Sequence, residues 1–236
     1  MDSQRVLAAV GHRPWSLPGG PWVMAQSWVD LLFAHWPVAV EQLQRLVPEP
    51  IPIDTFDGTA WLGITPFEVV EPRPRGLPPL PRFPELNVRT YTTLGGKPGI
   101  WFFSLDAGSL AAVWGARLTY RLPYFRAQMA IARESAIRYR SARTGARFAG
   151  TYAPVGPARI PVPGTLEHFL TERYCLYTRF GGRVLRAEIH HPPWPLQPAA
   201  ATLEENTMAP VALPAVEPLL HFARRQDVLI WPPRRL

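Results

Sequence analysis

The fold is decided by one stretch, residues 85–106, which reads ELNVRTYTTLGGKPGIWFFSLD. Its first nine residues alternate with the period of a strand and place Glu85, Asn87, Arg89 and Tyr91 on one face. The glycine-rich turn and the apolar second arm that follow are typical of a β-hairpin. We expect the second arm to be covered on both sides, as a strand inside a packed sheet is.

The register of this hairpin is predicted by the same pattern. With the turn centred after Gly96, Asn87 lies opposite Asp106, and polar residues pair with polar residues. Arg89 and Asp106 then become diagonal neighbours, within reach of a long side chain. We therefore predict that Glu85, Asn87, Arg89 and Asp106 share one face of the sheet and that the opposite face is packed. If the polar face is concave, it is a candidate site.

Composition favours a single β-rich domain. The chain has 236 residues, of which 47% are hydrophobic and 29 are proline. Many prolines and few long helical periodicities favour a mainly β fold over a helical bundle. We find no internal repeat and no boundary in composition, so we expect one domain over residues 1–236. The single cysteine, Cys175, excludes an internal disulfide framework and a cysteine-based metal cluster.

Several familiar motifs are missing from the sequence. It has no glycine-rich phosphate loop, no GxGxxG after a strand and no GxSxG nucleophile elbow, so we expect no cofactor. His190 and His191 face opposite sides of a strand, which argues against a metal site. No long apolar run follows the N-terminus, and no segment reaches transmembrane length without a charge or a proline. We therefore expect a cytoplasmic protein without a membrane partner. The sequence leaves open whether the protein forms a homo-oligomer.

The formal charge of +7 raises nucleic acid as a partner. Single-strand binders interleave aromatic and basic residues on an open sheet, which Tyr139 and Phe148 do only loosely here. We therefore rank a nucleic-acid or protein-interaction module last. Two further hairpins are expected around residues 144–145 and 181–182. The arginines that gather on the first of them are Arg138, Arg140, Arg143 and Arg147.

Three stretches carry a resemblance to a known family: LVPEPIPID at 46–54, ELNVRTY at 85–91 and GIWFFSLDA at 99–107. On these the chain resembles the YqjF-like bacterial family of unknown function, which belongs by fold to the acetoacetate decarboxylase-like superfamily. A further similarity to the decarboxylase itself lies in MAPVALP at 208–214. The resemblance implies a closed or cone-shaped antiparallel β-barrel with a few short flanking helices and a polar interior pocket.

The decarboxylase uses a lysine that forms a Schiff base with a β-keto acid. In the family pattern this lysine follows the hairpin, but residues 111–118 of this chain contain none. Arg117 cannot replace it, because a guanidinium stays protonated and is a poor nucleophile. Lys97, the only lysine, lies in a turn, where we expect it to be solvated. Schiff-base decarboxylation is therefore not expected.

Our first hypothesis is a barrel that binds a small organic acid or carbonyl compound. Arg89, with Arg117 nearby, holds the anion by charge-assisted hydrogen bonds, and aromatic side chains line the apolar remainder. An equal alternative is that Arg89 and Asp106 only neutralise each other. The ligand-binding candidates are Asn87, Arg89, Tyr91, Trp114, Arg117 and Tyr120.

Our second hypothesis is an enzyme that does not need a lysine and acts on a keto-acid-like substrate. Glu85 or Asp106 serves as general acid and base in this hypothesis, and Arg89 stabilises an enolate-like charge. Two acids beside one arginine suit such chemistry, but they also suit a structural ion-pair network.

Overall fold

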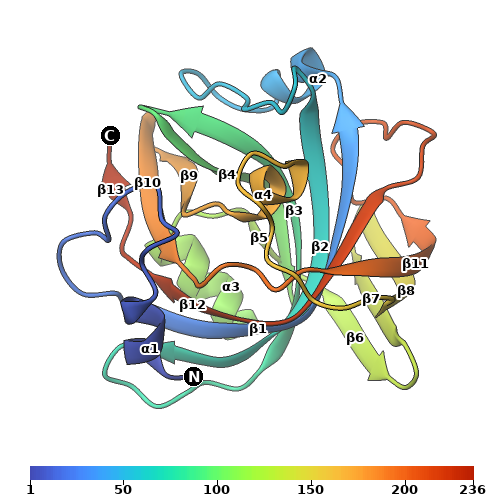
Figure 1. Cartoon of the computed structure of the whole chain (residues 1–236), viewed down its shortest axis with the longest axis horizontal. Helices are drawn as coiled ribbons and strands as arrows, with labels where there is room; N and C mark the ends of the chain where they lie inside the picture. Colours follow the sequence, from blue (N-terminus) through green and yellow to red (C-terminus); the bar gives the residue numbers. More distant parts are fainter.

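In the computed structural model, which covers residues 1–236, most of the chain forms one continuous sheet of thirteen strands (Figure 1). The mainly β class predicted from composition is confirmed. The strands are β1 (Met24–Val38), β2 (Ala60–Pro74), β3 (Phe83–Leu94), β4 (Lys97–Ala107), β5 (Tyr124–Arg126), β6 (Gln128–Arg133), β7 (Ile137–Arg143), β8 (Ala146–Pro154), β9 (Cys175–Phe180), β10 (Arg183–His190), β11 (Gln197–Asn206), β12 (Leu219–Ile230) and β13 (Arg234–Arg235).

Seven of these strands close into a ring, so the predicted barrel is present. They follow the order β10-β9-β4-β3-β2-β1-β12, and β12 returns to pair with β10 at Ile189 and Ile230. A cluster of 20 buried residues draws side chains from all seven strands. One seam of the ring departs from the antiparallel pattern, because β4 and β9 run parallel and pair at only two positions.

The hairpin of β3 and β4 turns one residue earlier than predicted. Gly95 and Gly96 form the two-residue connection between paired Leu94 and Lys97. Both glycines have positive φ angles, 61° and 71°, as the tight hairpin turn requires at its two central positions. A turn centred after Gly96 places Lys97 at such a position, where its Cβ makes that backbone conformation costly.

A β-bulge changes the pairing again farther from the turn. Arg89 pairs with Phe102, but Val88 pairs with Ser104, so Phe103 is an extra residue on β4. Beyond the bulge, Asn87 lies opposite Leu105 rather than opposite the acid that follows it. The predicted register is therefore wrong on both sides of the bulge, although the hairpin itself is confirmed.

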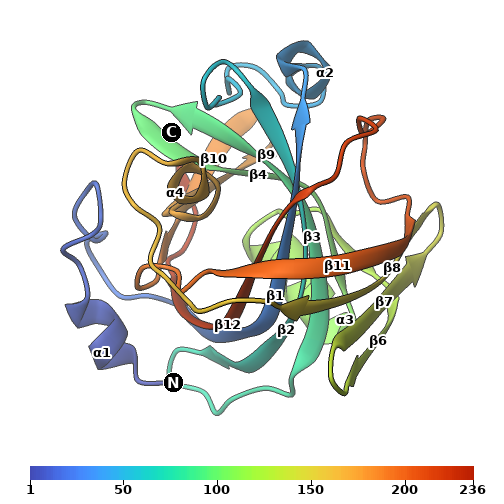
Figure 2. The same ribbon diagram turned by 45° about the vertical axis from the view of Figure 1, so that its right-hand side comes forward.

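A second layer packs against the outside of the barrel. It consists of β11, β8, β7 and β6, which continue from β12 and lie beside the ring in Figures 1 and 2. Tyr139 and Phe148 of this layer pack in the larger core cluster with Leu86 and Val88 of β3. The Tyr139 hydroxyl also donates to the carbonyl oxygen of Glu85 at 2.7 Å. Both aromatic residues are about 1% exposed, which removes them as surfaces for stacking bases.

Four short helices flank the strands, as predicted. Two begin at a hydroxyl residue, which the sequence alone suggests as a cap: Ser109 Oγ accepts from the Ala112 amide, and Thr165 Oγ1 accepts from the His168 amide. None is long and apolar enough to cross a membrane. In Figure 1 the fourth helix lies in front of the strands and the third lies behind them. The helices are α1 (Ser3–Ala8), α2 (Val40–Gln44), α3 (Leu110–Thr119) and α4 (Leu166–Thr171).

The C-terminal strands differ from the sequence-based expectation. The sequence favours two short strands near residues 219–222 and 228–231, but β12 runs unbroken through residues 219–230. It gives no expectation of β6 and β11. β11 is half exposed along much of its length, so its sequence lacks the apolar alternation of a buried strand. The hairpins predicted around residues 144–145 and 181–182 are confirmed as β7–β8 and β9–β10.

Candidate functional site

A line of polar side chains runs along β3 inside the barrel. Glu85, Asn87, Arg89 and Tyr91 alternate on this strand, and each is at most 5% exposed. The guanidinium of Arg89 lies 5.3 Å from the ring centre of Phe33, which belongs to the interior cluster. The strand period therefore placed four of the predicted site residues on one face, and closure of the ring turns that face inward.

Asp106 does not join this line. It lies opposite Leu86, on the outer side of the barrel wall, because the bulge shifts its pairing by one residue. Its carboxylate accepts from Arg143 Nε at 2.7 Å and from Ser141 Oγ at 3.2 Å. The predicted pair of Arg89 and Asp106 is therefore wrong, and Asp106 is anchored in the second layer.

Helix α3 also keeps two predicted ligand-binding residues outside the barrel. Trp114 is 55% exposed. Arg117 donates from Nε to the carbonyl oxygen of Tyr124 at 2.7 Å, and its guanidinium lies over the ring of Trp114. Tyr120, in contrast, lies in the interior cluster with a buried hydroxyl that has no hydrogen-bond partner. Burial raises the pKa of this hydroxyl above its usual value, so it stays protonated.

Arg89 carries an uncompensated charge inside the barrel. Its Nη2 donates only to the Tyr91 hydroxyl and to the carbonyl oxygen of Leu170, both at 3.4 Å. It forms no ion pair with any acid, and its Nε has no partner. Buried charges in proteins are normally paired, because an isolated one is costly to remove from water. This guanidinium therefore keeps N–H donors that no acidic side chain of the protein neutralises.

His35 lies beside Arg89 and was not among the residues predicted for the site. Its Nε2 is 2.6 Å from the Tyr91 hydroxyl. Complete burial lowers the pKa of His35 well below its usual value, with a further contribution from Arg89, so the ring is neutral. Tyr91 satisfies both neighbours when it donates to His35 Nε2 and accepts from Arg89. The ring proton then lies on Nδ1, which has no partner and is free to donate.

Gly63 allows His35 and Arg89 to come together. It pairs with His35 on one side and with Arg89 on the other, in the middle of β2. A Cβ at this position would lie 3.0 Å from the His35 ring and 3.4 Å from Arg89 Cγ. A larger residue would therefore press on both groups inside a closed interior.

Helix α4 covers this end of the site. The Leu170 carbonyl oxygen is a partner of Arg89, and the Phe169 ring lies 5.4 Å from the ring of Tyr91. Glu167 Oε1 is 4.0 Å from Nε2 of His221, a β12 residue that lies opposite Phe33. Nδ1 of His221 is buried without a partner. The helix thus encloses several unused hydrogen-bonding groups around Arg89.

Glu85 forms a second polar centre at the far end of the same line. Its carboxyl oxygen accepts from the Tyr124 hydroxyl at 2.9 Å. Burial raises the pKa of Glu85 to about 8, against the opposing effect of the Tyr124 hydrogen bond. At neutral pH the group is therefore mainly a carboxylic acid that can donate a proton.

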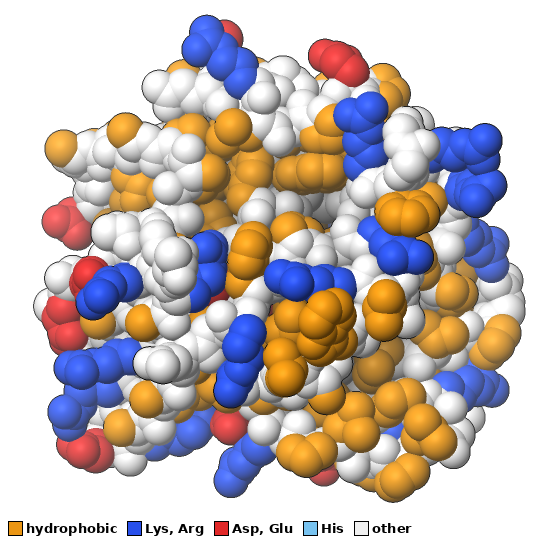
Figure 3. Space-filling model, turned by 180° about the vertical axis from the view of Figure 1, so that it is seen from behind, with side chains coloured by type: hydrophobic (Ala, Val, Ile, Leu, Met, Phe, Trp, Pro, Cys, Tyr) orange, Lys and Arg blue, Asp and Glu red, His pale blue; other side chains and the backbone are white.

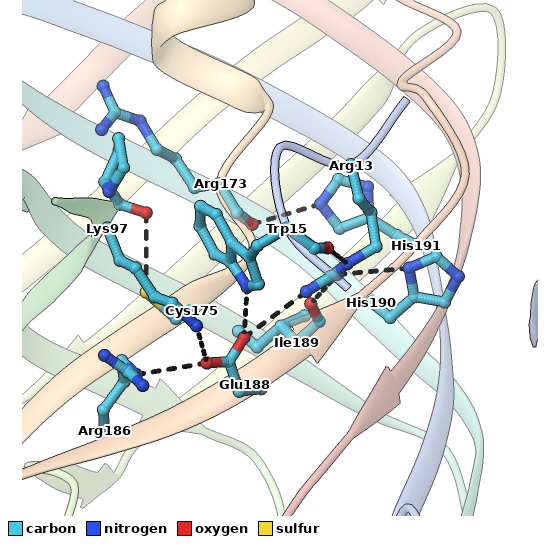
Figure 4. A network of polar contacts seen from close by, with 11 residues as sticks. Arg13, Trp15, Lys97, Arg173, Cys175, Arg186, Glu188, Ile189, His190 and His191 are labelled. Atoms are coloured by element: carbon cyan, nitrogen blue, oxygen red, sulfur yellow. Dashed lines mark hydrogen bonds and ion pairs between the residues drawn. The ribbon is translucent and has the colours of Figure 1, made fainter. Parts of the chain in front are cut away.

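Lys97 is held by an ionic network outside the polar line. Glu188 lies at its centre and binds Lys97 Nζ at 3.2 Å, Arg186 Nε at 3.2 Å and Arg13 Nη2 at 3.4 Å (Figure 4). The Trp15 indole also donates to Glu188, at 2.8 Å. The lysine side chain is only 28% exposed, so the expectation of a fully solvated turn lysine is wrong. The loop that carries Arg13 and Trp15 covers it, a contact between segments far apart in sequence.

An open groove lies where β4 and β9 separate. It has a volume of about 420 Å³ and includes Phe102, the residue that pairs with Arg89, together with Arg121 and Arg179. Arg89 itself does not line the groove. The buried line of polar groups and the surface groove are therefore separated by the side chain of Phe102.

Comparison with known proteins places the chain in a family. Residues 25–227 match the family DUF2071, described as an uncharacterized conserved protein. The uncharacterized protein YqjF of Bacillus subtilis (strain 168) is 46% identical over 230 residues, which cover 93% of this chain and 95% of that protein. The chain belongs to the DUF2071 family. The resemblance to YqjF-like proteins drawn from the sequence is thereby confirmed.

Solved structures similar to this DUF2071 protein are acetoacetate decarboxylase-like. The enduracididine biosynthesis enzyme MppR complexed with pyruvate matches with a TM-score of 0.64 and 11% identity, covering 94% of this chain and 93% of that one. Acetoacetate decarboxylase from Legionella pneumophila matches with a TM-score of 0.64 and 10% identity, covering 98% and 94%. At these identities the similarity shows the fold alone, and it agrees with the fold that the resemblance implied.

Proposed function

We propose that this DUF2071 protein binds a small organic acid or carbonyl compound inside the barrel, with Arg89 as the anion-binding residue. The unpaired, buried guanidinium of Arg89 is the observation that carries this proposal. A ligand carboxylate supplies the missing charge and can accept from both Arg89 and His35 Nδ1. It takes the place of the 3.4 Å contact between Arg89 and the Leu170 carbonyl oxygen of α4.

Two further points support this proposal. A protein of the same fold, MppR, was solved in complex with pyruvate, a small keto acid. Asn87 Oδ1 and Thr65 Oγ1, which lie on paired residues beside Arg89, are buried without partners and can contact the carbonyl or hydroxyl group of such a ligand. Lys97 is bound to Glu188 instead, so the proposed binding does not use a Schiff base.

Arg89→Met is expected to abolish organic-acid binding and to raise the stability of the ligand-free protein. Binding of pyruvate or acetoacetate should weaken by about 100-fold or more, because a charge-assisted bidentate contact is lost. Removal of an unpaired buried charge should stabilise the fold by roughly 1 kcal/mol or more. Calorimetric titration measures the first effect and urea unfolding measures the second.

Arg117→Met is the matched control, since it removes an arginine from α3 outside the barrel. It should leave organic-acid binding unchanged. Equal affinity of Arg89→Met and the unmodified protein for every acid tested would contradict the proposal. A fall in stability on Arg89→Met would show instead that the arginine is a structural group.

A second candidate function is an enzyme in which Glu85 acts as general acid. Its raised pKa of about 8 favours this role, because the group holds a proton at neutral pH. Glu85 lies four residues from Arg89 on one strand, about 13 Å away, so only a substrate longer than pyruvate reaches both. Turnover that is lost in Glu85→Gln, with acid binding retained, supports this function. Turnover that survives the substitution excludes it.

A further inference from the structure

A second open groove lies outside the barrel, between the end of the β7–β8 hairpin and the start of β6. Its volume is about 630 Å³. Three of its seven lining residues are arginines, Arg126, Arg143 and Arg147, and none is acidic. Two others, Ala127 and Ala142, have small side chains that leave the space between the guanidinium groups open.

Two of the three guanidinium groups are held in place by the protein. Arg143 donates from Nε to Asp106 at 2.7 Å, and its guanidinium lies 4.3 Å from the ring centre of Phe125. Arg126 donates from Nη1 to two backbone carbonyl oxygens. Each guanidinium keeps further N–H groups for a ligand. Because the groups are already fixed, binding an anion orders few additional side chains.

The charge in the groove is not balanced. Asp106 is the only carboxylate that contacts any of the three arginines, so three positive charges and one negative charge leave a local excess of two. Arg147 makes no side-chain hydrogen bond and no ion pair, and its side chain is exposed. Arginine side chains are also widespread, and acidic ones few, on the face seen from behind in Figure 3.

We propose that this groove binds a small phosphate-bearing anion with about two negative charges. A phosphate monoester has a charge of about −1.5 to −2 at neutral pH and three strong acceptor oxygens. It therefore matches both the local excess of charge and the three guanidinium groups, which bind phosphate through paired N–H donors. A monocarboxylate carries one negative charge, which is half of the local positive excess. The site is separate from the barrel interior and does not depend on the organic-acid proposal.

The surroundings favour a small molecule over a nucleic acid. On the outer face of β7, Arg140 lies between Ala130 of β6 and Ala149 of β8, so no aromatic ring lies beside it to stack on bases. Tyr139, Phe148 and Tyr152, the aromatic residues of this hairpin, are buried beneath the sheet. The arginine-rich hairpin identified from the sequence thus provides phosphate contacts without a stacking surface.

Calorimetric titration of the full chain with inorganic phosphate and with glycerol phosphate, at fixed ionic strength, tests the proposal. We expect saturable binding at one site. Arg147→Gln and Arg126→Gln should each weaken it by about tenfold, because each removes charge-assisted hydrogen bonds. Both side chains are exposed, so circular dichroism should show an unchanged fold.

Arg138→Gln is the control, since it removes the same charge from β7 but lies outside the groove and pairs with Glu134. It should keep full affinity, and so should Arg89→Met, which separates this site from the barrel interior. Absence of saturable binding, or equal weakening by Arg138→Gln, would overturn the proposal. Tighter binding of a short single-stranded RNA that also depends on Arg138 would overturn it in favour of a nucleic-acid surface.

Discussion

Replacing Glu85 with Gln is expected to flatten the dependence of stability on pH between about 6.5 and 8. Burial raises the pKa of Glu85 from 4.5 to about 8 in the folded protein. Between these two values the folded chain keeps a proton that the unfolded chain releases, so stability falls as the pH rises. The slope reaches about 1.4 kcal/mol per pH unit. Gln can still accept the Tyr124 hydrogen bond and does not ionise.

The interval above pH 6.5 isolates this effect from the histidines. Burial lowers the pKa values of His35, His191 and His221, and it lowers the pKa of His190 to about 4. These groups make stability rise with pH, but only up to their unfolded value near 6.5. Between pH 6.5 and pH 8, the free energy of unfolding of the unmodified protein should fall by about 2 kcal/mol.

Urea unfolding at a series of pH values measures this difference. Burial also raises the pKa of Asp106, opposed by Arg143, but its contribution is common to both proteins and cancels in the comparison. Glu217→Gln, which changes an exposed glutamate, should keep the slope of the unmodified protein. A Glu85→Gln profile as steep as that of the unmodified protein would show that Glu85 ionises normally in the fold.

Gly99→Ala is expected to cost more than about 4 kcal/mol of stability, at the upper end for single substitutions. A Cβ on Gly99 would lie 2.7 Å from the Tyr177 ring, 2.8 Å from Cys175 Sγ and 2.9 Å from the Cys175 carbonyl oxygen. Both neighbours are buried, and the carbonyl belongs to the backbone of β9, so neither can move without disturbing the seam of the barrel.

The same measurement on Gly19→Ala provides the control, because no atom lies within 4 Å of a Cβ there and its backbone is not left-handed. That substitution should change stability by less than about 1 kcal/mol. Hydrogen exchange should locate the damage of Gly99→Ala in β9 and β4. An alanine variant with unchanged stability would mean that the two strands pack less closely at this seam.

Local patterns predicted much of the fold. The alternation in residues 85–93 correctly placed Glu85, Asn87, Arg89 and Tyr91 on one face, since side chains of a strand alternate whatever surrounds it. The helix cap at Ser109 is predictable for a similar reason. The hydrogen bond that makes this cap spans only three residues. The position of the tight turn is also determined locally, because its two central residues need positive φ angles and Gly95 and Gly96 adopt them at low cost.

The candidate site was predictable only in part. The prediction misplaced Asp106 because a bulge adds one residue to β4. The added residue puts the Asp106 side chain on the outward face of that strand. Trp114 and Arg117 were misplaced because the sequence does not show that the exposed face of α3 lacks a covering element. His35 interrupts an apolar strand, but a histidine in such a strand is more often a hydrogen-bonded core residue than a functional one.

The sequence by itself determined which side chains of β3 share a face, where two helices begin, and that no lysine follows the hairpin. Only the tertiary structure decided that this face points inward, that Gly63 brings His35 to Arg89, and that no acid pairs with that arginine. The physical reason is the distance along the sequence over which each feature is determined. A strand period or a cap depends on residues a few positions apart, whereas the partner of a buried charge depends on how distant strands close into a ring.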